Sequence, residues 1–105
     1  MERLIRDGKV AVLVSPGFGA GWSTWASDDS QEALLFDPGL VELILSDSTQ
    51  DEIDSYVAER FPDQYTGGVE QLRVFWVPEG TKFRINEYDG SESLVTIDEE
   101  QWFTA

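Results

Sequence analysis

The sequence predicts an α+β fold, in which a mainly antiparallel sheet carries two helices on one face. Three observations favour this class: an Asp-Gly turn pair near the N-terminus, two helical patterns in the middle, and alternating apolar residues around a second Asp-Gly pair. With 105 residues and 41% apolar content, the chain has the size of one globular domain, so we expect a single domain over residues 1–105.

The N-terminal segment is typical of a β-hairpin that leads into a buried strand. Leu4 and Ile5 precede the pair Asp7 and Gly8. Such a pair favours a type I′ turn, because both central residues of that turn need a positive φ. The apolar run from Val10 to Val14 then predicts a buried strand. The pattern does not decide whether this strand lies at the centre or at an edge of the sheet.

Two helices are predicted next. Asp37 suits an N-cap and Pro38 the first helical position, where its missing N–H costs nothing. A shorter helical turn over residues 30–36 can precede this helix. The second helix is predicted to begin at Ser48, whose hydroxyl can cap the following amides. Its apolar positions follow helical spacing and predict one buried face: Ile53, Tyr56, Val57 and Phe61.

The C-terminal third predicts a three-stranded meander. Apolar residues alternate from Leu72 to Trp76 and again at Phe83 and Ile85, with a turn at residues 78–80 between them. The pair Asp89 and Gly90 predicts a hairpin into a last strand over residues 94–97. Trp102 and Phe103 are too apolar for a free tail, so we expect them to pack back on the sheet.

The composition removes much familiar chemistry. The chain has no cysteine and no histidine, which excludes disulfides, zinc sites built on those residues, thiol nucleophiles and triads with an imidazole base. No catalytic residues and no cofactor are therefore predicted, and the protein is expected not to be an enzyme. Neither a secretory signal nor a membrane-length apolar run is present, so a cytoplasmic location is expected.

Negative charge is concentrated in the middle of the chain. Residues 28–63 hold eleven carboxylates against one cation, Arg60, which makes ten of the fourteen net negative charges. A dense anionic surface repels nucleic acid and acidic membranes and favours basic protein surfaces. It can also imitate a phosphate backbone toward a protein that normally grips nucleic acid. The candidate partner-binding residues are Asp47, Asp51, Glu52, Asp54 and Glu59. A merely solvated acidic surface, or adaptation to a saline environment, is the alternative.

A glycine-rich loop follows the buried strand. Glycines that directly follow a strand let backbone amides approach a phosphate, and the tryptophans could stack on a base. The loop lacks the spacing of a dinucleotide fingerprint and the Gly-Lys-Ser/Thr ending of a phosphate loop. A tight turn whose aromatic residues fill the core, or a contact with another protein, are the other interpretations. The candidate ligand-binding residues are Ser15, Gly17, Gly19, Gly21, Trp22 and Trp25.

Metal binding is a further alternative. Asp47, Asp51 and Asp54 follow helical spacing, and clustered carboxylates bind Ca²⁺ or Mg²⁺. No EF-hand pattern is present, so no metal site is predicted.

The segments VAVLVSPGFGAGWSTW (residues 10–25) and WVPEGTKFRINEYDGSES (residues 76–93) resemble small uncharacterised proteins of phages and prophages. The resemblance implies a protein that binds a host factor, either to block restriction or other defence machinery or to sequester a nucleotide signal. The leading hypothesis is therefore a phage-type inhibitor that occupies a basic, nucleic-acid-handling surface of a host defence protein. Sequestration of a nucleotide by the glycine-rich loop is the alternative, and a structural subunit of a homo-oligomer is the third.

Overall fold

The computed structural model describes residues 3–17, 21–25, 28–62, 64 and 67–96. The α-helices follow one another between the second and third strands, and the sheets are antiparallel, which confirms the α+β class. The strands are β1 (Ile5–Arg6), β2 (Lys9–Val14), β3 (Arg73–Pro78), β4 (Phe83–Tyr88) and β5 (Ser91–Thr96). The α-helices are α1 (Asp28–Phe36), α2 (Pro38–Leu45) and α3 (Gln50–Arg60), with 3₁₀ turns η1 (Ser23–Trp25) and η2 (Val69–Gln71).

Two antiparallel sheets form, one in the order β1-β2-β3 and one from β4 and β5. Both predicted Asp-Gly turns are confirmed. Asp7 and Gly8 have φ values of 52° and 76°, and Asp89 and Gly90 have 52° and 85°. Two successive positive φ angles are what a type I′ turn requires, and its twist matches that of the flanking strands.

The predicted three-stranded meander is wrong, because β3 pairs with β2 instead of β4. The register runs from Lys9 opposite Pro78 to Val14 opposite Arg73. The Glu79 amide still donates to the Gly8 carbonyl at 2.8 Å, so the chain leaves the first sheet only at the following turn. The strand β2 is buried over most of its length, so its backbone groups need hydrogen-bond partners on both edges, which a position between β1 and β3 provides.

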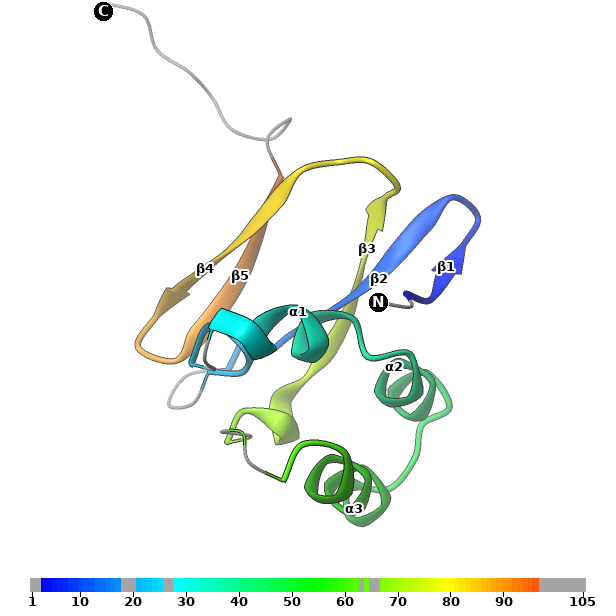
Figure 1. The fold of residues 1–105 in the computed structure, drawn as a ribbon, viewed down its shortest axis with the longest axis vertical. Coiled ribbons are helices and arrows are strands. Elements are labelled where there is room, and N and C mark those ends of the chain that lie inside the picture. Colours follow the sequence, from blue (N-terminus) through cyan, green and yellow to red (C-terminus); the bar gives the residue numbers. More distant parts are fainter. Residues whose placement is uncertain (1–2, 18–20, 26–27, 63, 65–66, 97–105) are drawn as a thin grey trace, which may run out of the picture.

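Two apolar clusters cover the two faces of β2. Ala11 and Leu13 pack with residues of α2 and α3, which confirms the prediction that these helices share one face of the sheet. The alternate residues of β2 pack with the end of α1 and, through partly buried side chains, with the β4–β5 hairpin. Figure 1 shows the hairpin on the left and α2 and α3 at the lower right, with β2 and β3 between them.

The helix boundaries follow local capping. Asp37 caps α2 as predicted, because its side chain accepts the Leu40 amide. The prediction that the next helix starts at Ser48 is wrong by one residue. The Ser48 amide still bonds to the Leu43 carbonyl of α2, so Thr49 provides the cap and accepts the Glu52 amide at 3.2 Å. The short helical turn expected over residues 30–36 is present as α1, which begins earlier, at Asp28.

The predicted apolar face of α3 is confirmed, since Ile53, Val57 and Phe61 are buried and Tyr56 is half-buried. None of the helices in the described ranges has the length and apolar character needed to cross a membrane.

The central position of β2 predicts a large effect of core truncation. Leu13 is fully buried, so replacing it with alanine leaves a cavity and is expected to lower the free energy of unfolding by about 2 to 5 kcal/mol. The control is Leu45→Ala, because Leu45 is 39% exposed and is expected to lose under about 1 kcal/mol. Urea denaturation measures both. Equal losses in the two variants would contradict the assignment of β2 to the centre of the core.

Candidate functional site

The exposed carboxylates of α2, of α3 and of the turn between them form a surface that we call the acidic helical face. The two helices pack against each other, and their buried sides both contact the cluster below β2. Asp47 closes the turn in a left-handed conformation (φ 59°), which aspartate tolerates better than most residues. The face comprises Glu42, Asp47, Asp51, Glu52, Asp54 and Glu59, all of them exposed. All five residues predicted for partner binding therefore belong to it.

The acidic helical face has no ion-pair partner in the part of the chain that the structure describes. Within the described residues, ion pairs join Arg3 to Glu32 at 3.1 Å and Arg60 to Asp37 at 3.3 Å, and none involves the acidic helical face. Arg60 is the one cation of the acidic third of the chain, and it faces a buried carboxylate rather than the exposed ones. Among the described residues, these six surface charges therefore have solvent and mobile ions around them and no ion-pair partner.

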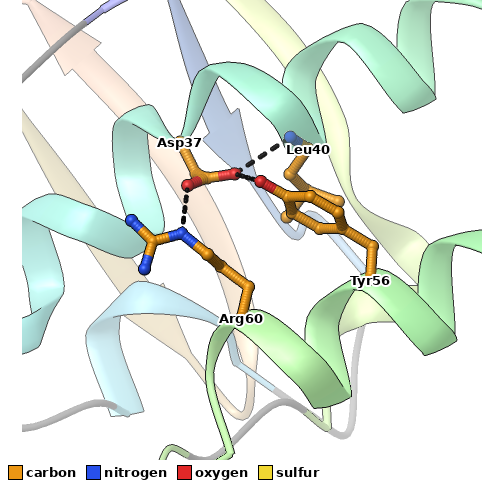
Figure 2. Close-up of polar contacts among 4 residues, drawn as sticks. All are labelled: Asp37, Leu40, Tyr56 and Arg60. Atoms are coloured by element: carbon orange, nitrogen blue, oxygen red, sulfur yellow. Dashed lines mark hydrogen bonds and ion pairs between the residues drawn. The ribbon is translucent and has the colours of Figure 1, made fainter.

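Asp37 fixes how the two helices meet (Figure 2). Its Oδ2 accepts the Leu40 amide at 3.0 Å and the Tyr56 hydroxyl at 2.6 Å, while its Oδ1 contacts Arg60 Nε. One carboxylate thus caps α2 and holds two side chains of α3. A Cβ at Gly39 would collide with the Tyr56 hydroxyl, so glycine permits this close approach. The spacing of the exposed carboxylates on the two helices consequently depends on this cluster.

The same cluster perturbs Tyr56. Burial, followed by the hydrogen bond to Asp37 and the negative charge of Asp37, raises the pKa of Tyr56 from 10.0 to about 12. The phenol therefore remains a hydrogen-bond donor to the carboxylate well into the alkaline range.

A shallow depression lies on the acidic helical face. Its walls combine carboxylates from three positions with an apolar and an aromatic side chain. Long basic side chains have apolar stems and charged ends, so they match such a lining. The lining residues are Leu43, Asp51, Glu52, Ser55, Tyr56 and Glu59. The structure thus brings three of the predicted partner-binding residues around one depression.

The glycine-rich loop surrounds an internal anion, the carboxylate of Glu92. This side chain is 1% exposed, and its Oε1 accepts the Ser15 amide at 3.0 Å. Its Oε2 accepts the amides of Trp22 and Thr24 at 2.9 and 3.0 Å and the Thr24 hydroxyl at 2.6 Å. Four donors to one buried carboxylate make strong, charge-assisted bonds. Ser15 and Trp22, two of the residues predicted to bind a ligand, therefore hold the protein's own carboxylate through their amides.

Other contacts close this loop further. The fully buried indole of Trp22 donates to the Leu34 carbonyl at 2.8 Å and meets the Phe61 ring edge-on at 6.3 Å. The Ser15 hydroxyl donates to the Gly68 carbonyl at 3.1 Å. A Cβ at Gly17 would overlap the Gln71 side chain. These described residues of the loop thus make contacts within the protein.

The remaining predicted ligand residues have different positions. Gly21 is buried, and a Cβ at Gly68 would collide with its carbonyl. Gly19, the side chain of Trp25, and the aromatic pair Trp102 and Phe103 lie outside the described residues.

Sequence reasoning missed Glu92. The available indication was its spacing from Leu94 and Thr96. Every second residue of a strand lies on the same side, so Glu92 shares one side of β5 with these two residues. An acid at such a position requires donors from elsewhere in the chain, and the Ser15–Thr24 loop supplies them.

The metal alternative gains no support. Among the described side chains, no group of three or more carboxylates is close enough to hold an ion, and this includes the aspartates at positions 47, 51 and 54.

Comparison with known proteins identifies no relative: no family model matches the chain, and no curated protein or solved structure matches it significantly.

Replacing Glu92 with glutamine tests the internal anion site. Glutamine replaces one carboxylate oxygen with an NH₂ group, which is itself a donor and cannot accept the bonds that this oxygen accepted. The free energy of unfolding is therefore expected to fall by on the order of 3 kcal/mol. The matched control is Glu79→Gln, because Glu79 is exposed and its replacement removes the same charge. Urea denaturation measures both. A similar small change in the two variants would show that the bonds to Glu92 contribute little.

The Tyr56 pKa predicts a stability loss at high pH. The pKa is raised in the folded state, so its stabilising contribution is complete below pH 10 and is lost as pH rises toward about 12. Denaturant midpoints measured across this range should fall more steeply in the natural protein than in Tyr56→Phe, which cannot ionise. Parallel curves would rule out a contribution from Tyr56 ionisation.

Proposed function

We propose that this protein is a non-enzymatic binding protein whose acidic helical face occupies a basic, nucleic-acid-handling surface of another protein. The observation that supports this proposal is the set of six exposed carboxylates without a partner cation among the described residues. Lysines and arginines that normally bind phosphates would pair with these carboxylates instead. Release of condensed ions and Coulombic attraction drive such an association, so it weakens as salt rises.

Preorganisation supports the proposal further. The Asp37 cluster links α2 to α3, so the carboxylates need little reordering when a partner binds. The depression adds apolar surface from Leu43 and Tyr56 for the stems of basic side chains. The resemblance to phage and prophage proteins adds the expectation that the partner is a host defence factor, which would make the protein an inhibitor.

We do not propose nucleotide binding by the glycine-rich loop. The amides of Ser15 and Trp22 donate to Glu92, and the Trp22 ring is fully buried. The third hypothesis, a homo-oligomer, would use exposed apolar strand edges and not the acidic helical face, because identical anionic surfaces repel each other.

A pair of charge-reversal variants tests the proposed function. Asp51→Lys with Glu59→Lys changes two residues that line the depression and have no side-chain hydrogen bond among those described. Capture of nucleic-acid-handling proteins from a host lysate, at low salt, is expected to fall at least about tenfold. Duplex DNA added to the lysate should compete for the captured protein, and added salt should release it.

The control is Glu70→Lys with Glu79→Lys, two exposed residues outside the acidic helical face that give the same change in net charge. This variant is expected to retain capture, and circular dichroism confirms that both variants fold. Equal capture by both variants, or an equal loss in both, would refute a specific role of the acidic helical face.

A further inference from the structure

A hollow lies beside the turn between β1 and β2. Its volume is about 290 Å³, and it is lined by Arg6, Asp7, Lys9 and Trp76. This volume is near the lower end of the range of ligand pockets, which is about 300 to 1,000 Å³. Figure 1 shows the turn at the upper right and α3 at the bottom of the molecule. The hollow contains no residue of the acidic helical face, so it is a separate part of the surface.

Two cations stand side by side in the hollow. Arg6 of β1 and Lys9 of β2 are directly opposite each other in the antiparallel pair. Their Cβ atoms are therefore about 5 Å apart, and like charges at such positions repel each other. Both side chains are exposed, and neither forms an ion pair with any residue that the structure describes. An arrangement that costs stability in this way is expected at functional sites.

Trp76 forms an aromatic wall of the hollow. It lies opposite Ala11, which follows Lys9 by two positions in β2, so Trp76 and Lys9 share one face of the sheet. Trp76 is half-buried and packs against the core cluster that contains Ala11 and Leu13. The ring is therefore held in place while part of it lines the hollow. A fixed indole offers a surface on which a flat ring can stack.

We propose that this hollow binds a mononucleotide. A phosphate monoester carries about −1.5 to −2 charges at neutral pH, so it matches two adjacent cations better than a singly charged carboxylate does. Its oxygens accept charge-assisted hydrogen bonds from Arg6 and Lys9. The base stacks on Trp76, and the Asp7 carboxylate, which also lines the hollow, accepts a hydrogen bond from an amino group of the base.

The net charge of the chain restricts the site to small anions. With a formal net charge of −14, the protein repels a long nucleic acid, which extends beyond the hollow into the negative field. Physiological salt screens exposed charges that are more than about 8 Å apart, so the two adjacent cations dominate for a ligand that fits within the hollow. The inference is independent of the proposed function, because it uses none of the exposed carboxylates of the acidic helical face.

An NMR titration with cytidine 5′-monophosphate tests the proposal, because this nucleotide carries a phosphate monoester and a base with an amino group. The amides of Arg6 and Lys9 and the indole resonance of Trp76 should shift and saturate. Cytidine and inorganic phosphate each carry one part of the ligand and should bind at least about tenfold more weakly. Absence of a saturable shift at these residues would overturn the proposal. Binding of cytidine alone, or of phosphate alone, as tightly as the nucleotide would also overturn it.

Matched variants separate the hollow from a general effect of charge. Arg6→Gln with Lys9→Gln is expected to weaken binding of the nucleotide at least about tenfold. The control is Arg73→Gln with Lys82→Gln, two exposed cations outside the hollow that give the same change in net charge. Circular dichroism confirms that both variants fold. An equal loss of affinity in the two variants, or unchanged affinity in the first, would overturn the proposal.

A third variant tests the aromatic wall. Trp76→Leu is expected to weaken binding of the nucleotide and to leave binding of inorganic phosphate unchanged, because only the base stacks on the ring. Unchanged binding of the nucleotide would overturn the proposal. Capture of a basic partner by the acidic helical face should be retained in the Arg6 and Lys9 variant, so failure of this inference and failure of the proposed function are distinguishable.

Discussion

The buried carboxylate of Glu92 is the interaction on which the rest of the structure depends. It accepts four hydrogen bonds from Ser15, Trp22 and Thr24, and its own amide donates to the Ser15 carbonyl. A buried charge is tolerated only where donors surround it, and buried amides likewise need acceptors. Glu92 meets both needs at once. It thereby joins the last strand to the end of β2 and holds the loop from which the chain enters α1, so the helical layer is placed relative to both sheets.

Carboxylates have two separate roles in this molecule: buried ones connect structural elements, and exposed ones give the helical layer its negative charge. Glu92 and Asp37 are buried and saturated with donors, and both connect elements that are distant in sequence. The acids of the acidic helical face are exposed to water and form no ion pair with any described residue. Arg60 explains much of this division, because it pairs with the internal Asp37 and leaves the outer charges uncompensated. The negative potential of the helical layer therefore follows from the way the core is built.

Local patterns were enough to predict the parts of the fold that local chemistry decides. The Asp-Gly turns, the Asp37 cap and the apolar face of α3 each depend on a few neighbouring residues, and all are confirmed. The prediction of a three-stranded meander was wrong because strand pairing depends on residues that are distant in sequence. The strand β3 pairs with the free edge of β2, and no local sequence pattern indicates this pairing. For the same reason the glycine-rich loop suggested an external anion, whereas the acceptor lies some 70 residues further along the chain. The exposed acids of α3 were predictable because helical spacing alone separates them from the buried face.

A double-mutant cycle between Glu92 and Thr24 tests the central interaction most directly. Thr24→Val removes the hydroxyl that donates to Glu92 at 2.6 Å while keeping the shape of the side chain, and Glu92→Gln removes the charge. Unfolding free energies of the natural protein, both single variants and the double variant give the coupling between the two residues. We expect a coupling on the order of 1 to 2 kcal/mol, as for a hydrogen bond to a charged group in a buried site. Additive effects of the two changes would contradict the claim that Glu92 holds this loop.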